Sequence, residues 1–160
     1  MDNLWRSLGG MVAVIGFAIV LNVPKRFLFL AGLDGGLGWF VYLVVEQWTG
    51  SMLAGTFAGA AVGSVIAHLF ARIFKTPVTM FVIPANLTLV PGAGMYRIVY
   101  YTLQSDDEMM MYYFQQTLLA AGVIAAAIFI VNILIENFVT GYQNIKKLIQ
   151  NCTFLHIFAH

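Results

Sequence analysis

The charges of this chain fall in small clusters, and the stretches between them have the length of membrane-spanning helices. A helix needs about 20 mainly apolar residues to cross the roughly 30 Å hydrocarbon core of a bilayer. Because exposed backbone cannot form hydrogen bonds in lipid, and because these stretches lack the alternation of barrel strands, we interpret them as helices. The sequence predicts an all-α polytopic membrane protein with five transmembrane helices, in residues 7–24, 27–45, 47–71, 76–96 and 109–135.

Composition excludes several other classes of protein. Hydrophobic residues make up 61% of the chain and charged residues only 9%, against about 25% charged in an average soluble domain. Such a chain cannot cover itself with polar surface in water. The net charge of +1 is too small to attract nucleic acid phosphates, so no nucleic-acid partner is expected.

The sequence also contains no motif that is typical of a metal site, a cofactor site or an active site. Cys152 is a single cysteine, and His156 and His160 have no third ligand beside them, so we expect no metal. The chain has no HExxH, GxSxG or glycine-rich phosphate motif, and we expect neither a cofactor nor a catalytic residue.

Basic residues predict the orientation. They follow the first, third and fifth predicted spans, as Lys25 and Arg26, Arg72 and Lys75, and Lys146 and Lys147. The positive-inside rule then places the N-terminus outside and the C-terminus inside. We therefore expect a five-helix domain over residues 1–136 and a cytoplasmic tail over 137–160, which either lies on the membrane surface as an interfacial helix or is frayed.

The predicted fourth span is unusual because it contains Pro77, Pro84 and Pro91. Proline bends or breaks a helix, and the glycines at 92 and 94 weaken helix further. We predict that this span is broken or kinked at Pro91-Gly92. A half-helix over 92–103 would then present its positive amide end to an anionic group, as in many transporters. The alternative is a proline kink that only shapes packing.

Small residues recur every four positions in the predicted third span, as Ser51, Gly55, Gly59, Gly63, Ala67 and Ala71. On a helix they form one narrow stripe along which another helix can approach closely. We interpret Gly55, Gly59 and Gly63 as helix-packing residues rather than as the lining of a pore.

Two charged residues interrupt the apolar stretches: Asp34 lies within the predicted second span, and Arg97 lies in the half-helix predicted over 92–103. Asp34 should face the bundle interior or water, where it either carries a coupling proton or is a structural acceptor. Arg97 follows the predicted break and either pairs with a substrate carboxylate or extends toward the outer headgroups. Residues 22–24, Asn-Val-Pro, indicate a helix end at the cytoplasmic interface.

Two stretches carry a resemblance to a known family: LNVPKRFLFLAGLDGGLGW over 21–39 and IPANLTLVPGAGMY over 83–96. In this order, on a five-span chain, they resemble the small protein of the bacterial threonine/serine exporter family. Asp34 departs from the family's glycine-rich span. The motif positions that carry over are Asn22, Val23, Pro24, Arg26, Pro84, Pro91, Gly92 and Tyr96.

The resemblance implies a multi-pass protein of the bacterial inner membrane that exports small amino acids with a larger partner chain, which has a soluble hydrolase-like region. It also leaves dicarboxylates such as succinate open as substrates. We predict that the half-helix over 92–103 receives the substrate carboxylate, with Pro91, Gly92, Gly94, Tyr96 and Arg97 as the binding residues. The alternative is a non-transporting subunit that stabilises the partner through the glycine stripe. A homo-oligomer of this chain is left open in addition.

Overall fold

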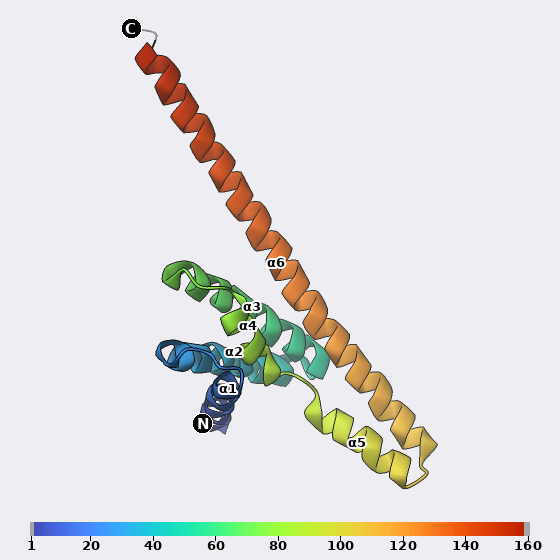
Figure 1. Cartoon of the computed structure of the whole chain (residues 1–160). Helices are drawn as coiled ribbons and strands as arrows, with labels where there is room; N and C mark the ends of the chain where they lie inside the picture. The colour runs from blue at the N-terminus through green and yellow to red at the C-terminus, as the bar shows by residue number, and fades with distance from the viewer. Residues whose placement is uncertain (1, 159–160) are drawn as a thin grey trace. The chain divides into compact units, whose positions relative to one another are not determined.

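The computed structural model describes the backbone of residues 2–158 and the side chains of residues 4–138. All regular structure in this part of the chain is helical, which confirms the all-α part of the predicted fold class. The elements are α1 (Asp2–Val20), η1 (Lys25–Phe27), α2 (Leu28–Thr49), α3 (Met52–Phe74), α4 (Thr79–Leu87), α5 (Gly92–Leu103) and α6 (Asp107–Phe158) (Figure 1).

Three stretches of helix in the described residues are long and apolar enough to cross a membrane: Lys25–Thr49, Met52–Phe74 and Asp107–Phe138. The first helix contributes a shorter apolar stretch, Leu4–Val20. The predicted fourth span corresponds to α4 and α5, which have 9 and 12 residues and lengths of roughly 14 and 18 Å. Neither reaches across a bilayer alone, so a fourth crossing requires both. Five spans and their orientation remain predictions.

The chain divides into two compact units, Met1–Ile128 and Phe129–His160. The second unit consists of the C-terminal part of α6, a continuous helix to Phe158. The side chains of the predicted tail from residue 139 onward, including His156 and His160, lie outside the described residues. The domain boundary after residue 136 therefore remains a prediction.

The Asn-Val-Pro sequence ends α1 through a left-handed residue. Asn22 has a φ of 56°, and its N–H donates to the carbonyl of Ile19 while the N–H of Val23 donates to that of Ala18. This pair of bonds is the Schellman motif, in which asparagine is one of the few residues that tolerate the left-handed position. Pro24 follows and cannot continue the helix. The chain therefore turns sharply here and starts η1.

Two groups of buried apolar side chains hold the first unit together. The first core cluster joins α1, η1, α2, α3 and α4 through Val14, Ala18, Val23, Phe27, Ala31, Ala67, Ala71 and Phe81. The second core cluster joins α3, the residues after α4, and α6 through Ala60, Leu89, Ile124 and Ala127. Between them the bundle is packed largely by small residues.

The glycine stripe of α3 faces α2. A Cβ at Gly59 would lie 2.8 Å from the carbonyl oxygen of Gly38, and one at Gly55 would lie 2.9 Å from that of Tyr42. Gly63 lies next to Asp34, whose Oδ1 would be 3.7 Å from the added Cβ. The stripe is therefore covered by α2 of the same chain and is not free to contact a partner subunit.

Candidate functional site

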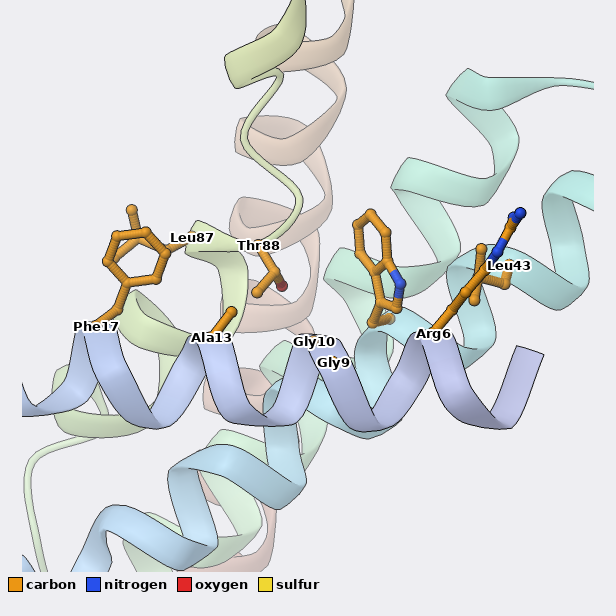
Figure 2. Close-up of a pocket in the computed structure, with 9 residues that line it drawn as sticks. Arg6, Gly9, Gly10, Ala13, Phe17, Leu43, Leu87 and Thr88 are labelled. Atoms are coloured by element: carbon orange, nitrogen blue, oxygen red, sulfur yellow. The ribbon is translucent and has the colours of Figure 1, made fainter. Parts of the chain in front are cut away.

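A cavity of about 580 Å³ lies between α1, α2 and the end of α4. Figure 2 shows its α1 wall as a row from Phe17 through Ala13 to Arg6, with Leu87 and Thr88 beside that row. The volume is in the range of small-molecule sites, roughly 300–1,000 Å³. The nine lining residues are Arg6, Gly9, Gly10, Ala13, Phe17, Trp39, Leu43, Leu87 and Thr88.

Local sequence explains why this space is open. Gly9 and Gly10 place no side chain on the α1 wall, and a Cβ at Gly10 would lie only 3.2 Å from the Trp39 ring. On the opposite side, α4 ends at Leu87, and the next helix begins at Gly92. Leu87 at the end of α4 and Thr88 directly after it therefore form one edge of the cavity.

The lining combines one cation with an apolar wall. Arg6 carries the only charge among the nine lining residues, and it is exposed. A guanidinium group presents a planar set of donors that matches a carboxylate with two parallel hydrogen bonds. The Thr88 hydroxyl donates to the carbonyl of Ala85 at 3.0 Å, which leaves its oxygen able to accept a further bond. The cavity therefore suits a small molecule that bears a carboxylate.

The residues that the sequence predicted for substrate binding lie after the cavity edge, on and before α5. Pro91 precedes the helix with φ −75° and ψ 61°. Its carbonyl accepts from the N–H of Met95, and α5 starts at Gly92, where an added Cβ would have no described atom within 4 Å. The lining of the cavity stops at Thr88, three residues before Pro91.

Two of the other predicted residues of α5, Gly94 and Arg97, contact α6. A Cβ at Gly94 would collide with the Oγ1 atom of Thr117. Arg97 donates to the hydroxyl of Tyr113 at 3.3 Å, and its guanidinium carbon lies 5.0 Å from the centre of that ring. Tyr96 is largely exposed. The structure thus brings Gly94 and Arg97 against α6 rather than into the cavity.

Sequence reasoning missed Arg6 and Thr88 as candidate site residues. Arg6 directly precedes the first predicted span, and Thr88 is an uncharged polar residue within the fourth. The available signal was the pair Gly9-Gly10 one turn after an arginine, which leaves room beside a cation on one helix. That signal does not identify which residues line the other side of the cavity, or how far they lie from Arg6.

Asp34 is fully buried within α2 and lies beside Gly63 of α3. It does not line the cavity. Its predicted role in coupling therefore stays separate from the cavity.

Comparison with known families settles what kind of chain this is. The family model described as Threonine/Serine exporter, ThrE, matches residues 6–134, which is most of the chain. The chain belongs to the threonine/serine exporter family. Membership confirms the resemblance seen in the sequence, and it indicates an exporter-type membrane transporter. No curated protein and no solved structure matches the chain.

The structure brings together several of the predicted motif positions that are distant in sequence. Asn22, Val23 and Pro24 at the end of α1 face Pro84 of α4 around a second cavity of about 220 Å³. Arg26 lies outside this group, with its guanidinium carbon 4.5 Å from the centre of the Phe27 ring. The Asn-Val-Pro turn and the α4 proline therefore belong to one structural feature.

Proposed function

We propose that this chain is a subunit of a secondary transporter that exports small amino acids such as threonine and serine across the bacterial inner membrane. It works with a larger membrane partner that has a soluble hydrolase-like region. Membership of the threonine/serine exporter family supports the transport class. The observation that carries the proposal is the cavity beside the end of α4, because it pairs an arginine with an apolar wall.

The proposed topology has five crossings, with α4 and α5 together forming the fourth. The N-terminus lies outside, and residues 137–160 form a cytoplasmic tail. The three long apolar helices and the shorter α1 support this arrangement. A crossing made of two short helices would place the interval between Leu87 and Gly92 inside the membrane, next to the cavity. Transport requires no cofactor in this chain.

In the proposed mechanism, the Arg6 guanidinium binds the substrate carboxylate while the apolar wall excludes water. The cavity is wide enough for a side chain as small as that of threonine or serine. The start of α5 supplies a second attraction, since its first N–H groups and helix dipole favour negative charge. Pro91 and Gly92 would hold this helix end in place, and Gly94, Tyr96 and Arg97 would position α5.

Dicarboxylates such as succinate are the second candidate substrate class. The reason is again Arg6, because its guanidinium recognises a carboxylate without requiring an amino group beside it. Efflux of labelled threonine, serine and succinate is therefore measured from cells with both chains and with the partner alone. Export of an amino acid only when both chains are present supports the proposal. Equal efflux of all three compounds with and without this chain refutes it.

Gly92→Leu tests the proposed role of the start of α5 in attracting the substrate carboxylate. The added side chain meets no described atom near Cβ, so we expect insertion and thermal stability to stay unchanged. It would cover the first amides of α5, and we expect export to fall about tenfold, as for loss of roughly 1.4 kcal/mol of binding. Efflux is compared with that of Gly122→Leu, another helical glycine with open space around its Cβ. Wild-type efflux from Gly92→Leu contradicts the assignment and favours a non-transporting role for α5.

A further inference from the structure

Three buried polar side chains lie on three different helices of the first unit. They are Asp34 of α2, Ser64 of α3 and Asn86 of α4, with exposed fractions of 0%, 0% and 6%. Among the described residues, both carboxyl oxygens of Asp34, the Ser64 hydroxyl and the side-chain carbonyl oxygen of Asn86 have no hydrogen-bond partner. Buried polar atoms are normally paired, so four unpaired oxygens on three helices form a candidate site for a bound ligand.

The packing of α2, α3 and α4 places these three side chains at about the same height along the helix bundle. Asp34 lies one turn after Ala31 of the first core cluster and one turn before Gly38, which contacts Gly59. Ser64 lies between Ala60 of the second core cluster and Ala67 of the first. Because α3 and α4 pack together, one residue of α4 lies at the same height in the bundle as Asp34 and Ser64.

Asn86 occupies that position on α4. It lies between Phe81 of the first core cluster and Leu89 of the second. The Cβ of a residue at Gly63, next to Ser64, would be 3.7 Å from the Asp34 carboxyl. Asp34, Ser64 and Asn86 therefore form one layer of polar residues, the polar layer, between two apolar clusters.

Within residues 4–138, no lysine or arginine is buried beside the polar layer, because all six are exposed: Arg6, Lys25, Arg26, Arg72, Lys75 and Arg97. His68 of α3 is half-buried, and its Nδ1 lies 2.7 Å from the backbone carbonyl oxygen of Ser64. A buried carboxylate without a partner costs several kcal/mol or more. A single carboxylate is neutralised by one monovalent cation. Ca²⁺, in contrast, takes 6–8 oxygen ligands and usually several carboxylates.

We propose that the polar layer is a Na⁺ site, with the Asp34 carboxylate providing the charge and Ser64 and Asn86 providing neutral oxygens. A small cation accepts several oxygens at once, and many transporters coordinate Na⁺ at the C-terminal ends of half-helices. Asn86 lies in the last turn of the short helix α4. Binding of Na⁺ requires only the folded chain and does not depend on transport. Only the further step, that Na⁺ drives export, rests on the proposed function.

The test is thermal unfolding of the full purified chain in detergent, with NaCl, KCl or choline chloride at equal ionic strength. A ligand that binds only the folded state raises Tm in proportion to the logarithm of its concentration once it exceeds Kd. We expect this rise with Na⁺ and not with choline, and a response to K⁺ at least about tenfold weaker. Equal responses to all three salts overturn the proposal, as does a response to acidification without any to Na⁺.

Variants separate the site from general salt effects. Asp34→Asn should abolish the Na⁺-specific rise, and Ser64→Ala should increase the half-maximal Na⁺ concentration by about tenfold. The matched control is Thr56→Val, because Thr56 is buried in α3 but its hydroxyl is satisfied by the carbonyl of Met52. An unchanged Na⁺ response in Asp34→Asn refutes the site. If that variant does not purify, an unchanged response in Ser64→Ala refutes it.

Efflux measured in parallel keeps the two proposals apart. Na⁺ binding without export leaves the polar layer supported and removes the export role. Export without any Na⁺ response removes the polar layer and leaves the exporter proposal intact. Dependence of export on Na⁺, lost in Asp34→Asn, supports coupling between them.

Discussion

Arg6→Ala is expected to reduce amino-acid export by roughly 10- to 100-fold. Hydrogen bonds to charged groups contribute about 1.5–3 kcal/mol, and each 1.4 kcal/mol corresponds to about a factor of ten. Arg6 is exposed and carries the only charge in the cavity lining, so its removal leaves no buried partner unpaired and should not unfold the chain. Efflux rates at several internal concentrations of threonine measure the effect.

The expected loss is mainly an increase in the half-saturating concentration, since Arg6 is assigned to binding. Arg6→Lys keeps the charge but loses the planar pair of donors, so it should be intermediate. Arg72→Gln is the control, because Arg72 is an exposed arginine of α3 outside the cavity. Arg6→Ala with the affinity and rate of the unmodified chain would show that the carboxylate binds elsewhere.

Gly59→Leu is expected to prevent formation of a stable bundle. Even a Cβ at this position would lie 2.8 Å from the Gly38 carbonyl oxygen and 3.1 Å from the Tyr42 Cβ. The first of these contacts is with backbone, so relief requires α2 and α3 to separate. Overpacking typically costs about 1–3 kcal/mol, and a leucine adds three more carbons to the same contact.

Size-exclusion chromatography and thermal unfolding of the detergent-solubilised protein measure this effect. We expect aggregated protein or a clearly lowered Tm for Gly59→Leu. Gly122→Leu should behave like the unmodified chain, because a Cβ at Gly122 has open space among the described atoms. An unchanged Tm for Gly59→Leu would mean that the two helices do not pack closely at this point.

The helical fold was predictable because it depends on local properties of the sequence. Clustered charges and long apolar stretches predict helices, and Pro91 with Gly92 predicts a weak point in the fourth apolar stretch. The structure has separate helices on the two sides of residues 88–91. The recurrence of small residues every four positions is equally local, and it identified the face of α3 that meets α2.

The candidate site was less predictable because it depends on contacts between distant segments. Nothing in the sequence near Arg6 states that Thr88, some 80 residues later, lies across the same cavity. Similarly, Gly94 looked like a flexible residue near the break, whereas in the structure it meets Thr117 of α6. Such pairings follow from how the helices pack, which periodicity within one segment does not specify.

Protection of an introduced cysteine by substrate tests most directly whether the cavity between α1, α2 and the end of α4 binds the exported molecule. Ala13 is exposed and lines the cavity, whereas Gly16 of the same helix is exposed and does not. Ala13→Cys and Gly16→Cys are each placed in a Cys152→Ser background and labelled with a small thiol reagent in the presence of the partner chain. The account predicts that threonine or serine slows labelling at position 13 but not at position 16. Equal labelling at position 13 with and without substrate, in a chain that still exports, would contradict it.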